Sequence, residues 1–273
     1  MFKKIGILGV GIMGKIITKA IHSHFPEIEL FLVARQLEKA RPFAQEVGAH
    51  LYATEDLVEV AKAVDTMIIC IKPHQFQPVF AKYYSDLTAL PHYLWISIAV
   101  GIRLETLQQL TPTTHHWVRL MPNTPLEVGE GYLALCHDDR TSQEELEWIQ
   151  QIFRPVAQVE IFDEQLFDTV SAIAGSGPAF MYQLVEALAD AGVKHGLNRY
   201  QAYRMIGQLL IGSGKMVLET DQHPGQLKDA VTSPGGTTIE GVAALEHHGF
   251  RSALISAIDQ TIQKASILSH KQE

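Results

Sequence analysis

Cysteine is scarce in this chain of 273 residues, and its only two cysteines, Cys70 and Cys136, each lie in an apolar, strand-like run. Neither forms a CxxC pair, so a dithiol redox centre is excluded, and such a low count gives no reason to expect a disulfide framework. We therefore expect two buried thiols in a protein of a reducing compartment.

Basic runs are also missing. The 22 Lys and Arg residues stand against 30 Asp and Glu residues, which gives a formal net charge of −8, and no basic stretch interleaves with aromatic residues. This balance argues against nucleic acid or an anionic membrane surface as the partner and favours a small molecule.

No apolar run is long enough for a membrane span. The longest uncharged stretch, Thr169 to Val185, contains two glycines and a proline, and it is shorter than the roughly 20 apolar residues that a spanning helix needs. The apolar run near the N-terminus is interrupted by glycines and lacks a cleavage site, so it reads as a first strand and not as a signal peptide. We expect a soluble, cytoplasmic protein.

Metal-binding patterns are absent as well, although the chain has 13 histidines. The adjacent pairs His115-His116 and His247-His248 should point apart on a strand or diverge on a helix, and no HExxH motif occurs. The sequence predicts no metal site. It also lacks a GxSxG elbow or a Cys–His signature for nucleophilic catalysis.

Short apolar runs alternate with amphipathic helical patterns up to about residue 160. This alternation predicts an α/β fold with an N-terminal Rossmann-type domain over residues 1–162, built on a doubly wound and mostly parallel sheet. The expected strands are IGILGV, ELFLVA, AHLYA, TMIICIK, YLWISIAV, HHWVRLM, GYLALC and VAQVEIF.

Strand patterns stop after residue 162, and Asp163 is a candidate cap for the first of several helices. We expect residues 163–273 to form an all-helical dimerisation domain that also binds the substrate. Within it, MIGQLLIGSGKMVL is apolar around most of its circumference, so this helix must be buried, and a domain of this size offers few places to bury it. Interlocking of two subunits is the favoured explanation, and an intrachain core helix is the alternative.

A glycine-rich motif follows the first expected strand, Lys4 to Leu8, and opens a helix. In that context GxGxxG is the fingerprint of a dinucleotide-binding turn. Gly9 would permit the tight turn, Gly11 would let a pyrophosphate approach the backbone, and Gly14 would let the helix pack on the strand. The expected cofactor contacts here are Gly9, Val10, Gly11, Ile12, Met13 and Gly14.

The second expected strand ends near Ala34, where a site selective for NAD would place an acidic residue that binds the ribose 2′-hydroxyl. Arg35 follows instead, and its guanidinium could face a 2′-phosphate. NADPH is therefore the expected cofactor, with NADH as a second option. A solvated surface arginine is the alternative.

Three further loops follow expected strands and should meet at the carboxyl edge of the sheet, where open α/β sheets bind ligands. Lys72 could reach the cofactor or simply start a helix, and the two prolines of RLMPNTP fix a rigid loop that could be merely structural. The cofactor-binding candidates in these loops are Cys70, Ile71, Lys72, Pro73, Ala99, Val100, Met121, Pro122 and Asn123.

The stretch from Val231 to Glu246, VTSPGGTTIEGVAALE, places a proline and two glycines before an expected helix and surrounds them with hydroxyls. Such a turn directs free backbone N–H groups at one point, which suits a small anion. A carboxylate site and a hydride donor in one chain suggest a reductase of a small carboxylic acid.

With these motifs the chain resembles the pyrroline-5-carboxylate reductase family over nearly its whole length. The resemblance rests on Gly9 to Gly14, Ile71 to Pro73, RLMPNTP from Arg119, AGSGPAF from Ala174, HPGQLKD from His223, and Val231 to Glu246. It implies NAD(P)H-dependent reduction of the cyclic imine Δ1-pyrroline-5-carboxylate to L-proline, the last step of proline biosynthesis.

The resemblance also implies roles for the C-terminal turn. Backbone amides of Ser233, Gly235, Gly236 and Thr237 would hold the substrate carboxylate, and Thr238 would exchange a hydrogen bond with the ring nitrogen as the catalytic residue. Asp221 would lie close to the substrate, although a helix-surface carboxylate is an equally good interpretation. Two subunits would intertwine through the helical domain, and dimers could assemble into larger rings.

One departure from the family concerns the cofactor. Relatives commonly have an Asn where the helix after the third strand begins, and this chain has Thr54-Glu55-Asp56, whose charge would repel a 2′-phosphate unless it points away.

Two other functions stay open. A 3-hydroxyacid dehydrogenase would use a lysine on a long helix, which residues 163–191 lack, and a non-catalytic NADP-sensing dimer would bind an effector at the turn.

Overall fold

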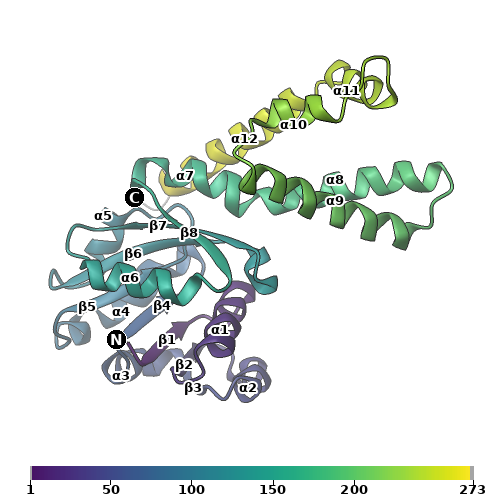
Figure 1. Cartoon of the computed structure of the whole chain (residues 1–273). Coiled ribbons are helices and arrows are strands. Elements are labelled where there is room, and N and C mark those ends of the chain that lie inside the picture. Colours follow the sequence, from purple (N-terminus) through teal and green to yellow (C-terminus); the bar gives the residue numbers. More distant parts are fainter. Residues whose placement is uncertain (1, 271–273) are drawn as a thin grey trace. The chain divides into compact units, whose positions relative to one another are not determined.

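The structure is a computed structural model that describes residues 2–270. It divides into two compact units. The first comprises the described residues up to Ser176 together with those from Thr261 to His270, and the second comprises Gly177–Gln260. Each unit is described by itself below, and Figure 1 labels their elements.

The first unit is built on one sheet of eight strands in the order β3-β2-β1-β4-β5-β6-β7-β8. All neighbouring strands are parallel except β6 and β7. The predicted mostly parallel, Rossmann-type sheet is confirmed, including the strand order of that fold through β6. The strands are β1 Lys4–Leu8, β2 Glu29–Ala34, β3 His50–Ala53, β4 Thr66–Ile69, β5 Tyr93–Ser97, β6 His115–Pro122, β7 Gly131–His137 and β8 Ala157–Ile161.

Helices cover both faces of this sheet, because alternate residues of each strand enter two different apolar clusters. One cluster joins Ile5 and Ile7 of β1 to α1, α2 and α6, and the other joins residues such as Trp95 to α3, α4 and α5. The sheet is therefore doubly wound, as predicted. These helices are α1 Ile12–His24, α2 Leu37–Glu46, α3 Leu57–Ala63, α4 Phe76–Leu87, α5 Leu104–Gln109 and α6 Gln143–Phe153.

The chain continues past β8 into short turns that still belong to the first unit. These are η4 Glu164–Leu166, α7 Phe167–Val170 and a π-helical turn, η5 Ser171–Gly175. Phe167 is only 1% exposed within the core of the sheet. The compact unit thus runs on past residue 162, because this segment packs on the sheet, and the predicted division of the chain into domains at residues 162 and 163 stays a prediction. Asp163 lies at the N-cap of η4, but its side chain makes no capping hydrogen bond.

The second unit is entirely helical. It contains α8 Gly177–Lys194, α9 Arg199–Glu219, α10 Pro224–Ala230, α11 Thr237–His247 and the first part of α12 Phe250–His270. Its own core is small: Ala189 of α8 packs with Ala202 and Ile206 of α9, and Val185 packs against them.

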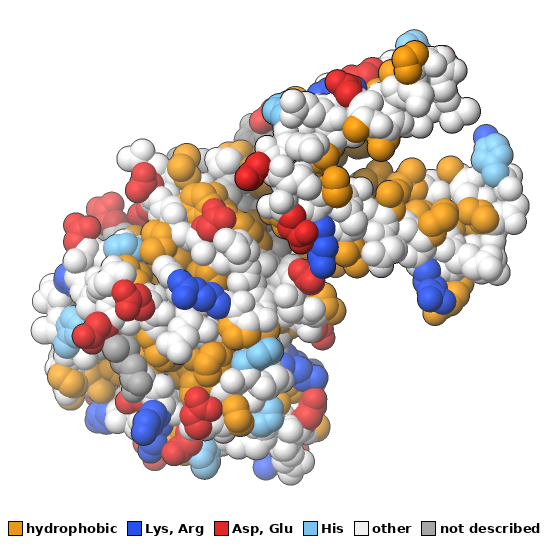
Figure 2. All heavy atoms as spheres, viewed as in Figure 1, with side chains coloured by type: hydrophobic (Ala, Val, Ile, Leu, Met, Phe, Trp, Pro, Cys, Tyr) orange, Lys and Arg blue, Asp and Glu red, His pale blue; other side chains and the backbone are white. Residues whose placement is uncertain are grey.

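Helix α9 is mostly exposed within one chain. Only Ala202 and Ile206 of this helix are buried, whereas Leu209 is 56% exposed and Ile211 is 54% exposed. The alternative that α9 is an ordinary core helix of one chain is therefore wrong. Figure 2 shows apolar side chains on the surface of this helical part of the chain.

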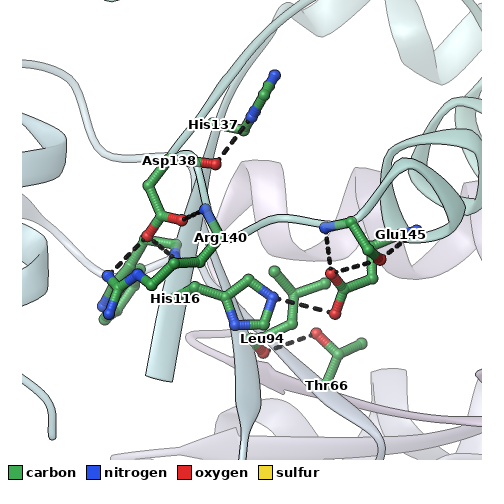
Figure 3. A network of polar contacts seen from close by, with 9 residues as sticks. Thr66, Leu94, His116, His137, Asp138, Arg140 and Glu145 are labelled. Carbon is green, nitrogen blue, oxygen red and sulfur yellow. Dashed lines mark hydrogen bonds and ion pairs between the residues drawn. The ribbon is translucent and has the colours of Figure 1, made fainter. Parts of the chain in front are cut away.

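Two adjacent histidines of β6 lie on opposite sides of the sheet, as the sequence predicts. His115 is 1% exposed, and its Nδ1 accepts a hydrogen bond from Trp95 Nε1 at 3.0 Å. His116 is 0% exposed, and its Nε2 lies 3.0 Å from Glu145 Oε1 (Figure 3). Burial lowers the pKa of both imidazoles from the usual value of 6.5.

These lowered pKa values predict a loss of stability in mild acid. Below the unfolded pKa the unfolded chain binds protons that the native chain does not, so stability falls as pH drops through about 6.5, by up to about 1.4 kcal/mol per pH unit for each group. Chemical denaturation at pH 7.5 and pH 5.5 measures this difference. An equal or higher free energy of unfolding at pH 5.5 would contradict the prediction.

Candidate active site

The glycine motif forms a turn whose shape excludes side chains at two positions. Gly9 has a φ of 103°, in the region that favours glycine, and its N–H donates to Val33 O at 2.9 Å. A Cβ on Gly9 would lie 2.8 Å from Cys70 O, and a Cβ on Gly14 would lie 2.0 Å from Gly9 O. The expected roles of these two glycines in turn geometry and close packing are confirmed.

Gly11 behaves differently. A Cβ at this position would meet nothing within 4 Å, so the absence of a side chain leaves its outer side open to a ligand. Gly11 is also the N-cap of α1, a helix with no side-chain cap and no acidic residue in its first turn. The helix therefore starts with N–H groups that no side chain satisfies, an arrangement that suits a pyrophosphate. Contact of the cofactor with Val10, Ile12 and Met13 stays a prediction.

Other cofactor candidates follow strands at the same edge of the sheet. The chain order reverses between β1 and β4, so the glycine turn after β1 lies beside Cys70 after β4, where Cys70 N donates to Leu8 O at 2.7 Å. Ala99 and Val100 follow β5, and Met121 and Pro122 end β6. Such a switch point is where doubly wound sheets bind dinucleotides.

The backbone of Lys72 takes part in a helix start. Its N–H donates to Gln75 Oε1 at 3.1 Å, and Pro73 begins the short turn η2 Pro73–Gln75. This supports the interpretation that Lys72 starts a helix, while contact of its exposed side chain with a cofactor stays a prediction.

The two thiols differ. Cys136 is buried, as predicted, and burial raises its pKa to about 12, whereas Cys70 is only half-buried, because it lies where β4 has ended. Burial also raises the pKa of the Cys70 thiol. Both are free thiols, and neither is ionised near neutral pH.

Arg35 directly follows β2, is exposed, and forms no ion pair with any residue that the structure describes. On the neighbouring strand, Ala53 N donates to Asp56 Oδ2 at 3.1 Å, so this carboxylate is turned back to the start of η1 Thr54–Asp56. The Asp56 carboxylate is thus hydrogen-bonded within its own turn, and its repulsion of a 2′-phosphate stays a prediction. Arg35 remains available for a phosphate.

Asn123 has an unexpected role. Its Nδ2 donates to Ala174 O at 3.1 Å and its Oδ1 accepts from Tyr132 N at 2.9 Å, so both polar atoms are engaged within the chain. Nearby, Ser171 Oγ donates to Met121 Sδ at 3.6 Å. Asn123 therefore joins the end of β6 to the start of β7 and to the π-helical turn. Nothing in the sequence indicates these partners.

An ion pair of Arg119 and Glu164 was not predicted. Arg119 Nη1 lies 2.6 Å from Glu164 Oε1, which also accepts from Leu104 N at 2.6 Å. The guanidinium carbon lies 4.5 Å from the Phe167 ring centroid, and both charged groups line a cavity of about 220 Å³. The sequence does indicate that Arg119 has a partner, because an arginine inside the apolar run of β6 would be buried and needs an opposite charge.

The C-terminal turn has the geometry that its sequence indicates. Gly236 N donates to Ser233 O at 3.0 Å, and Gly235 has a φ of 68°, so Ser233 to Gly236 form a β-turn. Gly236 is the N-cap of α11, and no side chain caps this helix. Thr237 and Thr238 begin α11 and are exposed. Their backbone N–H groups are available to an anion.

The segment before this turn is also ordered by local bonds. Asp221 has a φ of 51°, uncommon for a residue with a side chain and, as an outlier, compatible with a functional role. His223 caps α10, with its Nδ1 accepting from Gly225 N at 3.0 Å and its N–H donating to Gln226 Oε1 at 3.2 Å. The HPGQLKD motif thus has a structural function, and contact of Asp221 with a substrate stays a prediction.

Within the described part of the chain, no helix combines the length and apolar character needed to cross a membrane. The sheet order, the glycine turn and the helical second unit define a dinucleotide-dependent oxidoreductase with a Rossmann-type domain. Two family models match: pyrroline-5-carboxylate reductase dimerisation over residues 164–268, and NADP oxidoreductase, coenzyme F420-dependent, over residues 4–101.

Relatives that align over nearly the whole chain are also pyrroline-5-carboxylate reductases. The chain is 36% identical to the pyrroline-5-carboxylate reductase of Escherichia coli (strain K12), covering 98% of this chain and 99% of that one. It is 33% identical to the Arabidopsis thaliana enzyme, covering 97% and 95%. The crystal structure of Plasmodium falciparum pyrroline carboxylate reductase with NADP bound has a TM-score of 0.86 at 29% identity, covering 97% and 98%. The chain belongs to the pyrroline-5-carboxylate reductase family.

The position of Arg35 after β2 predicts a preference for NADPH over NADH. Arg35→Ala should raise the KM for NADPH roughly tenfold or more, because a charge-assisted hydrogen bond contributes about 1.5–3 kcal/mol. The KM for NADH should not change. Steady-state kinetics with both cofactors measure this, and Arg41→Ala, which removes another exposed arginine of the same region, is the control. Equal changes for the two cofactors would exclude a 2′-phosphate contact.

Proposed function

We propose that this protein reduces Δ1-pyrroline-5-carboxylate to L-proline with NADPH as the preferred hydride donor and NADH as an alternative. The observation that carries the proposal is 36% identity to a reductase of that name across 98% of the chain. The first unit supplies a dinucleotide site and the second supplies a turn suited to a carboxylate.

The residues of the nucleotide half fit such a cofactor. The open side of Gly11 and the uncapped start of α1 would hold the pyrophosphate, and Arg35 would bind the 2′-phosphate. Bound NADPH supplies the hydride that adds to the imine carbon. The protein's part is to hold the imine carbon about 3–3.5 Å from that donor, which makes the reaction effectively unimolecular.

The C-terminal turn would hold the substrate. Backbone N–H groups at Ser233, Gly235, Gly236 and Thr237 would bind its carboxylate, and the helix start favours the negative charge. The hydroxyl of Thr238 would hydrogen-bond to the ring nitrogen. An imine nitrogen that has taken up a proton from water draws electrons from the carbon, which then accepts hydride, and the product amine keeps that proton in its N–H bond.

The direct test is NADPH oxidation by the purified protein with Δ1-pyrroline-5-carboxylate, repeated with NADH and, in reverse, with a 3-hydroxyacid and NADP⁺. Rapid oxidation with the imine alone supports the proposal. If only the 3-hydroxyacid is turned over, the proposed function is wrong and the protein is a 3-hydroxyacid dehydrogenase. If NADPH binds but no substrate is turned over, the protein is a non-catalytic NADP sensor.

The proposed hydrogen bond between the Thr238 hydroxyl and the ring nitrogen predicts that this residue contributes to turnover. Thr238→Ala should lower kcat by roughly tenfold to a thousandfold, because loss of one preorganised hydrogen bond to the reacting group costs about that much. The residue is exposed at the start of α11, so the fold should be unchanged. The measurement is turnover at saturating substrate, with circular dichroism to check folding.

Thr238→Ser is the matched variant, because it keeps the hydroxyl and removes only a methyl group. It should retain most of the activity. An unchanged kcat in Thr238→Ala would remove this hydroxyl from the mechanism.

The dimerisation model over residues 164–268 and the exposed apolar side chains of the second unit support a homodimer. Soluble monomers rarely expose this much apolar surface. Assembly of dimers into a larger ring and a cytoplasmic location stay predictions. The exposed large apolar residues of α8 and α9 include Met181, Tyr182, Leu188, Val193, Tyr200, Tyr203, Met205, Leu209, Ile211, Met216, Val217 and Leu218.

Leu209→Glu tests the dimer. The side chain is 56% exposed in one chain, so the fold should tolerate the change, whereas a carboxylate buried unpaired between subunits should weaken association by roughly tenfold or more. Sedimentation velocity over a concentration series measures this. Tyr84→Glu, at an exposed aromatic position of α4, is the control. A monomeric wild-type protein, or no change in Leu209→Glu, would contradict the prediction.

A further inference from the structure

Three possible metal ligands from separate segments meet at the amino edge of the sheet. His92 immediately precedes β5, His116 lies at the start of β6, and Glu145 lies in the first turn of α6. One ligand atom of each lies within 4.8 Å of the other two. The predicted absence of a metal site rested on histidines adjacent in sequence, whereas these residues approach each other only in the fold.

His116 is the central member of this group. Its side chain is fully buried, its Nε2 lies 3.0 Å from Glu145 Oε1, and its Nδ1 has no hydrogen-bond partner. The nitrogen that faces Glu145 is Nε2, so this is the atom available to an ion, and Nδ1 would then carry the imidazole proton. A neutral imidazole is the state in which histidine binds metals.

Glu145 divides its carboxylate between two functions. Oε2 accepts hydrogen bonds from Ser142 N at 2.8 Å and from Ser142 Oγ at 2.9 Å. The first of these, together with Glu145 N donating to Ser142 Oγ at 3.2 Å, forms the capping box of α6. Oε1 is directed at His116 instead. The cap fixes the orientation of this oxygen, as hydrogen bonds to ligating carboxylates do in metal sites.

His92 completes the group from the solvent side. Its ring stacks on that of His116, with centroids 4.2 Å apart and an interplanar angle of 20°. Because His92 is exposed, its ring can turn from this stack to place a nitrogen beside the other two ligands.

The distances suit zinc. Ligands about 2.1 Å from a tetrahedral Zn²⁺ lie about 3.4 Å from each other, and the separation of His116 Nε2 and Glu145 Oε1 is 3.0 Å. Binding would require this pair to separate by about 0.4 Å and His92 to move inward. We propose that His92, His116 and Glu145 bind a Zn²⁺ ion, with water as the fourth ligand, and that the ion ties the loop before β5 and the start of β6 to α6.

The site would stabilise the fold and take no part in hydride transfer. Its residues precede β5 and lie at the start of β6, whereas the cofactor loops follow the carboxyl ends of these strands. The competing explanation is that Glu145 only caps α6 and accepts a hydrogen bond from His116. The two explanations differ in what happens when zinc is added.

The experiment titrates ZnCl₂ into the full-length, chelator-treated protein and follows the thermal unfolding midpoint and the heat of binding. Zinc should raise the midpoint in a saturable way with one ion per chain, and EDTA should reverse the rise. His92→Ala should weaken binding at least roughly tenfold, and it should fold normally because the residue is exposed. The matched control is a His247→Ala/His248→Ala double variant, since this pair offers two adjacent histidines elsewhere.

No saturable response in the wild-type protein would overturn the proposal. So would an equal response in His92→Ala, or a response lost only in the His247/His248 variant, because zinc would then bind at other histidines. The proposal does not depend on the reductase activity, since binding and unfolding are measured without substrate.

Discussion

The nucleotide half of this protein depends on a contact between backbone segments that leaves no room for side chains. Gly14 of α1 lies against the carbonyl of Gly9, and Gly9 lies against the carbonyl of Cys70. A side chain at either glycine would push α1 away from β1 and β4. Since the start of α1 is also the expected anion site, the same contact that closes the fold sets the position of the pyrophosphate.

The fold could be predicted largely because its signals are local. The strands buried on both faces appear as continuous apolar runs, and Gly9 to Gly14 mark the first turn without reference to the rest of the chain. The packing of the segment after β8 could not be predicted as well. Phe167 packs on the sheet although its surrounding pattern is helical, and a helical pattern does not reveal which core the helix joins.

The candidate site was predictable to a different extent. The turns carry their own geometry in Gly9, Gly235 and Gly236, so their residues could be named from the sequence. The partners of Asn123 and Arg119 could not, because each bonds to a segment more than forty residues away, Ala174 at a separation of 51 and Glu164 at a separation of 45. Pairing at such distances is decided by the topology of the sheet and leaves no periodic pattern.

The edges of the sheet have a consequence for aggregation. β3 is a short strand of four residues, and β8 presents exposed Gln158 and Glu160 along its outer edge. Short or charged edges resist the addition of further strands, which would otherwise continue without limit into fibrils. Both ends of the sheet therefore discourage the addition of a strand from another chain, which keeps the sheet at its eight strands.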